Sequence, residues 1–238
     1  NNNLINTVNE LEKMKDQFTN QSGDKEKFIK ESIQAFEDIN FFVHQTYKTK
    51  NLSEPYLSWH ESWRDAGLPT RLSDDADMER DIAKLAAITG NTNFQDTYYN
   101  LTTIVQKTDF WRYAKLYLEG GIYADIDFVA KPAFRSLVKE FIDSDKELLA
   151  FRENLRGLGW LGLQLGVDTF VRYPQLSQAV MVVRAPRHPV YRLALEEVCR
   201  RLAAGSWRRE PDPLRRTLEL TGPGVYTDAV RAWFARRR

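Results

Sequence analysis

The stretch that decides the interpretation of this chain is Gly120-Gly121-Ile122-Tyr123-Ala124-Asp125-Ile126-Asp127. The two glycines end a long helical pattern over residues 96–118, and the apolar run after them predicts a short strand over 122–128. Side chains alternate along a strand, so we expect Asp125 and Asp127 on one face at its carboxyl end. Carboxylates this close repel each other unless a cation neutralises them, and oxygen ligands suit Mg²⁺ or Mn²⁺. The stretch is compatible with a metal site, although an Asp-x-Asp triplet alone is more typical of a solvated strand end.

The preceding helical pattern strengthens the metal-site interpretation. Asp109 and Arg112 are three residues apart, hence on one helix face, and the tight glycine turn brings that helix beside the strand. An arginine there offers a planar fork to a phosphate or a sugar hydroxyl, and an aspartate accepts from hydroxyls. The alternative is an ion pair on a solvated face. The neighbouring aromatic side chains, Phe110, Trp111 and Tyr113, favour the first interpretation.

Outward from this centre, strands alternate with helices. A β-branched and aromatic run predicts a strand over 39–45, and a helix over 77–89 is stopped by Gly90. Further strands are predicted over 147–151 and 179–184, with helices after Pro189 and from Tyr226 onward. Such alternation predicts an α/β fold with a mainly parallel central sheet.

The N-terminal residues follow a different pattern. One apolar stripe at helical spacing is formed by Leu4, Val8, Leu11, Met14 and Phe18, and a second helical stretch runs through Phe28 and Phe36. We therefore divide the chain into a helical N-terminal segment, residues 1–38, and an α/β domain, residues 39–238. The segment is either a stem that can self-associate or a helical layer packed on the domain.

Composition and charge exclude several classes of protein. Of the 238 residues, 42% are apolar and 12% aromatic, so the chain is not a disordered linker, and no run of eighteen apolar residues occurs. Its only cysteine, Cys199, forms no intramolecular disulfide. The net charge of +1 argues against a dedicated nucleic-acid binder. Residues 1–150 nevertheless carry a charge of −7 and residues 151–238 a charge of +8. The basic half suits a phosphate-bearing ligand or an anionic membrane, or the two halves attract each other.

Three segments together resemble one enzyme family. The sequence of residues 107–113, followed by 120–127, is similar to the core signature of glycosyltransferase family 32, and 42–49 resembles the family's opening strand and nucleotide loop. The segment Thr221-Gly222-Pro223-Gly224-Val225-Tyr226-Thr227-Asp228 resembles the closing motif of its initiation-type α-1,6-mannosyltransferases.

The resemblance implies a GT-A (Rossmann-like) fold, a nucleotide-sugar donor, a divalent metal (Mn²⁺, or Mg²⁺) and retention of anomeric configuration. By the same resemblance Asp125 contacts the donor and, with Asp127, ligates the metal, while Asp109 and Arg112 hold the donor sugar. These four are the implied catalytic residues. The implied donor-binding set adds His44, Gln45, Thr46, Tyr47, Tyr123, Thr221, Gly222, Pro223 and Asp228. His44 is as readily a buried strand histidine, and Tyr47 stands where relatives often have tryptophan.

Three functions remain open. The first is a mannosyltransferase that uses GDP-mannose and a glycan acceptor, and the second is a transferase that uses a UDP-hexose or acts on an inositol-phosphoceramide sphingolipid. The third is a degenerate, non-catalytic binding module. No protein general base is assigned, although Asp109 and Asp168 are candidates, and Arg152, Arg156 and Trp160 are pocket candidates without a role.

The resemblance also implies a compartment. Family members of this type act in the Golgi lumen as type II membrane proteins, so we expect a membrane anchor outside this sequence. Three Asn-x-Ser/Thr triplets, at Asn20, Asn51 and Asn100, are compatible with a secretory lumen.

Overall fold

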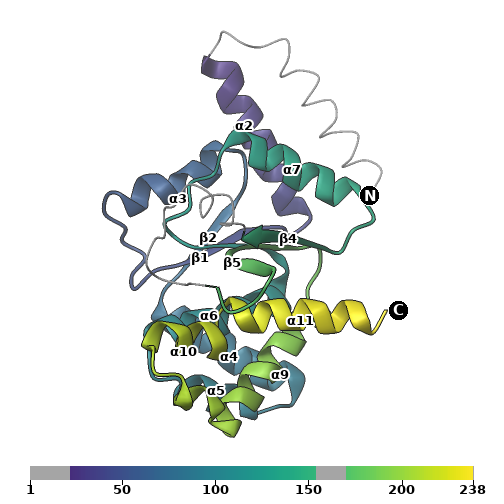
Figure 1. The fold of residues 1–238 in the computed structure, drawn as a ribbon. Helices are drawn as coiled ribbons and strands as arrows, with labels where there is room; N and C mark the ends of the chain where they lie inside the picture. The colour runs from purple at the N-terminus through teal and green to yellow at the C-terminus, as the bar shows by residue number, and fades with distance from the viewer. Residues whose placement is uncertain (1–21, 154–169, 238) are drawn as a thin grey trace, which may run out of the picture.

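A five-stranded sheet forms the centre of the protein (Figure 1). The computed structural model describes residues 22–153 and 170–237. The sheet order is β2-β1-β3-β5-β4. The strands are β1 (Val43–Thr46), β2 (Thr70–Ser73), β3 (Gly121–Ala124), β4 (Leu148–Glu153) and β5 (Gln175–Val183). β1 pairs in parallel with β2 and β3, whereas β5 pairs antiparallel with both β3 and β4. Four strands therefore point in one direction and only β5 is reversed, so the predicted α/β fold with a mainly parallel sheet is confirmed.

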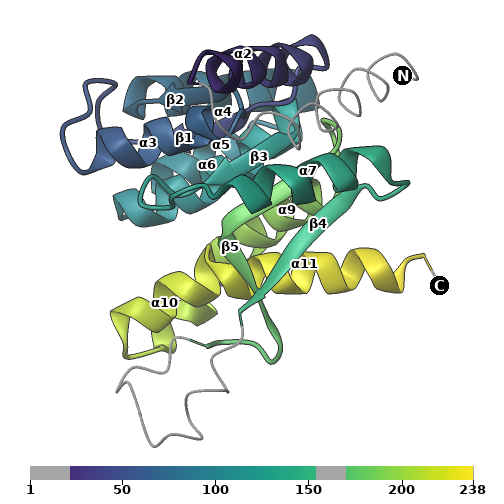
Figure 2. The same ribbon diagram turned by 90° about the horizontal axis from the view of Figure 1, so that it is seen from above.

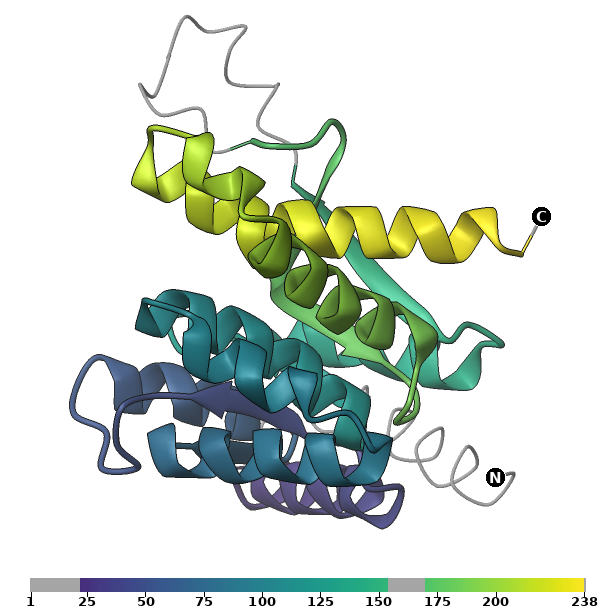
Figure 3. The ribbon, with the colours of Figure 1, turned by 90° about the horizontal axis from the view of Figure 1, so that it is seen from below.

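Helices cover both faces of this sheet (Figures 1 and 2). One face carries α2 (Ser22–Asp38), α3 (Tyr56–Asp65) and α7 (Pro132–Asp143). The other carries α4 (Asp75–Thr89), α5 (Asn93–Asn100), α6 (Ile104–Glu119), α9 (Pro189–Ala204), the 3₁₀ turn η1 (Ser206–Arg209), α10 (Pro213–Leu220) and α11 (Pro223–Ala235). Figure 3 shows α4, α5, α6 and α9 side by side on this second face.

The alternation of strand side chains gives each face its own hydrophobic core. Ile122 and Ala124 of β3 join Val180 and Val182 of β5 beneath α2, α3 and α7. Tyr123 points to the opposite face, where the larger core is built from α4, α5, α6, α9 and α11. The buried charged residues of α6 that are discussed below lie on the same face of the sheet as Tyr123.

Several predicted elements are present with small shifts at their ends. The helix predicted over 77–89 is α4, whose C-terminus is closed by Gly90 with φ of 64°. β1 begins at Val43 rather than residue 39, and β5 begins at Gln175, four residues before the predicted start. The helices predicted after Pro189 and from Tyr226 are α9 and α11.

Two predictions about the central stretch were wrong. The helix predicted over 96–118 is two helices, because Leu101 is extended (φ −70°, ψ 134°) and Thr103 caps a new helix by accepting from the backbone N–H of Gln106. The strand predicted over 122–128 ends at Ala124, since Phe128 N–H donates to Asp125 O and closes a turn. Strand alternation therefore does not govern the side on which Asp127 lies.

The turn between α6 and β3 requires glycine. Gly121 has φ of 87°, a conformation that disfavours residues with a side chain. A Cβ built there would lie 2.5 Å from the carbonyl oxygen of Phe42, so the backbones of β1 and β3 approach as closely as glycine permits. This close approach places the residue after β3, Asp125, beside the end of β1.

The described part of the N-terminal segment packs on the domain. Phe36 of α2 belongs to the core beneath α2, α3 and α7, and the Arg135 guanidinium lies 4.4 Å from the ring centre of Phe28. The division at residue 38 stays a prediction, and residues 1–21 lie outside the described part. Within that part, no helix combines the length and apolarity needed to cross a bilayer.

Candidate active site

The candidate site lies where four elements meet. β1 and β3 end there, β5 begins there because it is reversed, and α11 starts beside them. Arg112 of α6 is at the centre and is only 5% exposed. Open α/β sheets bind ligands at the carboxyl ends of their strands, so this is the expected edge for a functional site.

Arg112 is shared between two carboxylates. Its Nη2 lies 3.0 Å from Oδ1 of Asp109, and its Nη1 lies 3.2 Å from Oδ1 of Asp125. Nη1 also donates to the carbonyl oxygen of Gln178 over 3.1 Å, and the guanidinium lies 4.5 Å from the ring centre of Tyr123. These contacts hold a buried cation directly behind the first aspartate of the Asp125-Ile126-Asp127 triplet. The pair predicted on one helix face is therefore buried, not solvated.

Asp109 is the buried one of the two carboxylates, and both of its oxygens are hydrogen-bonded. It is 2% exposed, and Oδ2 accepts a 2.8 Å hydrogen bond from Thr221 while Oδ1 accepts a 2.9 Å hydrogen bond from Gln178. Burial raises the pKa of Asp109 to about 6, and the charge of Arg112 opposes that rise. With both oxygens engaged, Asp109 holds Arg112 and the start of α11 rather than facing an open cavity.

Asp125 is the exposed side. Tyr123 Oη donates to its Oδ1 over 2.6 Å, and burial raises the pKa of Tyr123 well above its ordinary value, so this hydroxyl remains a donor. Within the described chain Oδ2 of Asp125 makes no hydrogen bond, and the side chain is 31% exposed. One oxygen is therefore held and the other is available to a ligand.

A relay of polar side chains fixes the backbone at Asp125. Gln45 Nε2 donates to Asp125 O over 3.2 Å, and Gln45 Oε1 lies 2.7 Å from Nδ1 of His60. Thr70 Oγ1 lies 3.4 Å from His60 Nε2. Since Gln45 Oε1 can only accept, His60 carries its proton on Nδ1, and burial lowers the pKa of His60 and keeps it neutral. The relay joins β1, α3 and β2 to the residue that follows β3.

Asp127 is exposed and makes no hydrogen bond or ion pair with any described residue. No group of three His, Cys, Asp or Glu side chains in the described part of the chain could hold a metal ion alone. Asp127 and the second oxygen of Asp125 nevertheless offer hard oxygen ligands, and Mg²⁺ or Mn²⁺ commonly takes one or two carboxylates and completes its shell with phosphate and water. The residues fit a metal that is bound together with a phosphate-bearing ligand.

The end of β1 carries an aromatic cluster. The ring centres of Tyr47 and Tyr56 are 4.7 Å apart, and those of Tyr56 and Trp59 are 5.4 Å apart. Thr46 Oγ1 donates to Ser73 O over 3.0 Å and ties this loop to β2. Tyr47 is half-buried beside these rings, and a planar base can stack on such a surface.

Of the segment 221–228, which was predicted to close the site, only the first residues contact it. Tyr113 Oη lies 2.8 Å from Thr221 O and 3.1 Å from Gly222 O. Gly222 has no room for a side chain, because a Cβ would lie 2.7 Å from Cα of Leu218, and Pro223 is the first residue of α11. Asp228, one turn further along α11, instead bonds to Arg172 and Arg201 and makes no contact with Arg112 or Asp125.

His44 is 1% exposed, and its Nε2 lies 3.1 Å from Gly120 O. Burial, followed by the charge of Lys115, lowers its pKa to about 3. The ring is therefore neutral, donates from Nε2 and ties β1 to the glycine turn. It does not face the open edge of the sheet.

Gln178, Tyr113 and His60 complete the site and were not predicted from the sequence. Gln178 lies in the polar first half of β5, before the start of the predicted strand at residue 179, and no sequence signal distinguishes it from Gln175 or Ser177. The candidates Arg156, Trp160 and Asp168 lie outside the described residues. Arg152, in β4, is described, and nothing in the structure assigns it a role at this site.

A sequence model described as "Glycosyltransferase sugar-binding region containing DXD motif" matches residues 7–142, more than half of the chain. The chain belongs to this family. It is similar to the initiation-specific α-1,6-mannosyltransferases of Candida albicans (26% identical over 209 residues, 79% of this chain and 51% of that protein) and Schizosaccharomyces pombe (28% over 207 residues, 81% and 48%). It is also similar to HOC1 of Saccharomyces cerevisiae, which is named as a glycosyltransferase (30% over 149 residues, 58% and 35%). The chain thus spans about half, or less, of the length of these relatives.

Among solved structures, the PaToxG glycosyltransferase aligns with a TM-score of 0.44 and 15% sequence identity, over 87% of this chain and 79% of that one.

The Asp-x-Asp triplets of this glycosyltransferase-family chain differ in their surroundings. The sequence contains three, at residues 75–77, 125–127 and 143–145. Asp77 belongs to the capping box at the start of α4 and pairs with Lys50 and Arg80. Asp143 pairs with Lys139 at the end of α7. Only the triplet at 125–127 lies next to a buried arginine at the carboxyl end of a central strand, and it keeps carboxylate oxygens without partners in the described chain.

Proposed function

We propose that this chain is the catalytic part of a retaining, metal-dependent glycosyltransferase that moves mannose from GDP-mannose to a glycan acceptor. The observation that carries the proposal is Arg112, held between Asp109 and Asp125 at the first aspartate of the Asp125-Ile126-Asp127 triplet. The family membership and the two mannosyltransferase relatives support the donor and the reaction type.

A sugar nucleotide presents a diphosphate whose charge must be stabilised as the glycosidic bond breaks. Asp125 and Asp127 would hold a divalent cation, which would supply Lewis-acid stabilisation of that leaving group. Arg112 supplies a second, permanent positive charge in a buried position, where electrostatic stabilisation is stronger than in water. The hydroxyl of Tyr123 holds Asp125 in the orientation that the ligand meets.

Asp109 has a positioning role in this proposal. A nucleophile must reach the anomeric carbon, whereas both oxygens of Asp109 are engaged by Thr221, Gln178 and Arg112. We therefore assign no side chain as nucleophile or general base. The incoming hydroxyl oxygen bonds to the anomeric carbon on the face from which the phosphate leaves, which gives retention of configuration, and the leaving phosphate accepts the hydroxyl proton.

The proposed donor base stacks at the aromatic cluster of Tyr47, Tyr56 and Trp59 after β1. The proposed compartment is the Golgi lumen. Two of the three glycosylation triplets are compatible with it, because Asn51 and Asn100 are exposed and Asn100 ends α5 rather than lying inside a longer helix.

The decisive experiment is nucleotide release from a panel of GDP- and UDP-sugars, with Mn²⁺ or with chelator, by the native chain and by Asp127→Asn. We expect metal-dependent release from GDP-mannose that the variant lacks. The variant should unfold at the same temperature as the native chain, because Asp127 is exposed and makes no described contact. Asp145→Asn is a matched control, since Asp145 is an exposed aspartate of another triplet.

Release from a UDP-sugar would overturn the mannose donor and leave the transferase site intact. Full activity of Asp127→Asn would remove the metal assignment. If no donor binds to the native chain with Mn²⁺ in a direct binding measurement, the chain is a degenerate binding module.

A further inference from the structure

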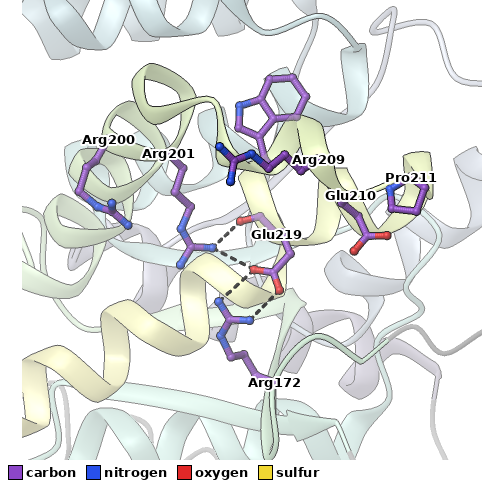
Figure 4. Close-up of a pocket in the computed structure, with 8 residues that line it drawn as sticks. Arg172, Arg200, Arg201, Arg209, Glu210, Pro211 and Glu219 are labelled. Carbon is purple, nitrogen blue, oxygen red and sulfur yellow. Dashed lines mark hydrogen bonds and ion pairs between the residues drawn. The ribbon is translucent and has the colours of Figure 1, made fainter.

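A second pocket lies on the helical face, away from Asp125 and Asp127. It has a volume of about 530 Å³ and lies among α9, η1, α10 and the segment before β5 (Figure 4). The pocket is lined by Arg172, Arg200, Arg201, Trp207, Arg209, Glu210, Pro211 and Glu219. Four of the eight residues are arginines, so we asked which of their charges are already neutralised.

Two of these arginines form a closed wall. Arg172 donates to both carboxylate oxygens of Glu219 at 2.8 and 3.0 Å and to Asp228 at 2.7 to 3.0 Å. Arg201 bonds to the backbone oxygen of Glu219 and to Asp228 Oδ2, and its Nε donates to Glu197 over 2.7 Å. Dashed lines in Figure 4 join both arginines to Glu219. These contacts hold both arginines in place, and carboxylates neutralise their charges.

The pocket groups that remain unused are all hydrogen-bond donors. The guanidinium of Arg209 has no partner among the described residues, and Arg200 uses only Nε and Nη2, both to Glu197. The buried Nε1–H of Trp207 also finds no acceptor in the described part of the chain. A buried donor without a partner costs free energy, so it favours a ligand that supplies an acceptor.

The acceptors in the lining are already engaged. Glu219 is used by Arg172 and Arg201, and Glu210 accepts from Asp212 N–H at 3.3 Å and lies 3.6 Å from Arg215 Nε. A ligand of this pocket must therefore bring acceptors rather than donors.

The side chains at the edge of the pocket are also positively charged. Arg208 lies against the ring of Trp207 at 5.0 Å, and Arg216 donates only to the backbone oxygens of Glu210 and Pro211. With Arg209, three guanidinium groups at this edge have no carboxylate partner within the described chain. Such a surplus attracts an anion and binds phosphate oxygens through planar forks.

We propose that this pocket binds the phosphate group of a phosphorylated saccharide. Arg209, Arg200 and the indole N–H of Trp207 donate to the phosphate oxygens. The volume of about 530 Å³ far exceeds what a single phosphate needs and falls in the range of small-molecule sites. The indole ring provides an apolar surface on which a sugar ring packs.

The pocket is joined to the candidate active site through one short segment. Glu219 lines the pocket, and Thr221, two residues later, donates to Asp109.

The test is a calorimetric titration of mannose 6-phosphate, mannose and inorganic phosphate into the full chain, with chelator present so that metal-dependent donor binding is silent. The variants are Arg209→Ala, Trp207→Phe, which keeps an aromatic ring but removes the N–H, and Arg236→Ala. Arg236 is an exposed arginine at the other end of α11, so the last variant removes the same charge outside the pocket.

We expect mannose 6-phosphate to bind the native chain and Arg236→Ala equally, and to bind Arg209→Ala and Trp207→Phe at least about tenfold more weakly, since each variant removes a charge-assisted hydrogen bond. Mannose should not bind. Equal binding by Arg209→Ala and Arg236→Ala would overturn the pocket assignment, as would no binding at all. If inorganic phosphate binds as tightly as mannose 6-phosphate, the saccharide part of the proposal is wrong. Donor turnover is measured in a separate assay. A negative calorimetric titration would therefore not contradict the proposed transferase function, and absence of donor turnover would not contradict phosphate binding in this pocket.

Discussion

Thr221 Oγ1 donates a 2.8 Å hydrogen bond to Oδ2 of Asp109, although the two residues are 112 positions apart in the chain. The bond joins the middle of α6 to the residue that follows α10, and both partners are almost completely buried. Through Asp109 it also acts on Arg112. The geometry of the candidate site therefore depends on a contact between the sequence segments 107–113 and 221–228.

Replacing Thr221 by valine removes this hydroxyl and keeps the shape of the side chain. We expect a loss of about 2 kcal/mol in the free energy of unfolding, because a buried charged acceptor loses its donor. Donor turnover should fall as well, since Asp109 no longer orients Arg112. Thr221→Ser keeps the hydroxyl and is the control in urea unfolding and nucleotide-release assays. Equal stability of the valine and serine variants would contradict this account.

Removing Arg112 should cost far more than removing an exposed ion pair. Arg112→Ala leaves Asp109 as an uncompensated buried charge, so we expect a loss of about 3–5 kcal/mol, compared with about 0–1 kcal/mol for a surface pair. Arg112→Lys keeps the charge but cannot span both aspartates, and it should raise the KM for the donor more than it changes stability. A lysine variant with the native KM would argue against a donor contact. Both variants are compared by urea unfolding and by donor titration.

His44 should make the protein sensitive to acid. Its pKa is about 3 in the folded chain and 6.5 as the ordinary value, so between these values the unfolded chain binds more protons than the folded chain. Stability is therefore lost as the pH falls below about 6.5. Between pH 7 and pH 4.5 we expect the native chain to lose about 3 kcal/mol more than His44→Gln, which cannot be protonated. Parallel pH curves for the two proteins would show that the histidine is not responsible.

Gly121→Ala tests the close approach of β1 and β3. The new Cβ meets Phe42 O at 2.5 Å with φ at 87°, so we expect a loss of about 3 kcal/mol or more, or failure to fold. Gly90→Ala is the matched control, because its φ is 64° but nothing lies within 4 Å of the added Cβ. That variant should lose only about 1 kcal/mol in thermal unfolding. Similar losses in the two variants would mean that backbone conformation, rather than the contact with Phe42, sets the cost.

The sequence was informative where a local rule controls the structure. Gly90 and Gly120 end helices because each has positive φ, and the helices predicted over 77–89, after Pro189 and from Tyr226 are α4, α9 and α11. The burial of Asp109 and Arg112 was also correctly inferred, from the aromatic residues around them. All of these signals act within a few residues of the position they predict.

The sequence was less informative where contacts between distant segments of the chain determine the structure. The cap at Thr103 interrupts a continuous helical pattern, and its effect is visible only once Gln106 N–H is seen to donate to its hydroxyl. The turn after Asp125 replaces the expected strand because Trp63 of α3 donates to Phe128 O over 2.9 Å and fixes that turn. Gln178 reaches Asp109 and Tyr113 only because β5 is reversed. Spacing within one segment carries no information about such contacts.

The reversal of β5 also affects how this protein can diversify. β4 ends and β5 begins at the same edge of the sheet as the candidate site, with Glu153 paired to Gln175 and a 2.6 Å hydrogen bond between their side chains. The connection between these two residues is thus tied at both ends beside the site. Doubling the length of such a connection costs only about 0.6 kcal/mol in closure entropy. Insertions and deletions at this one place can change the surroundings of the site while strand order and register are inherited unaltered.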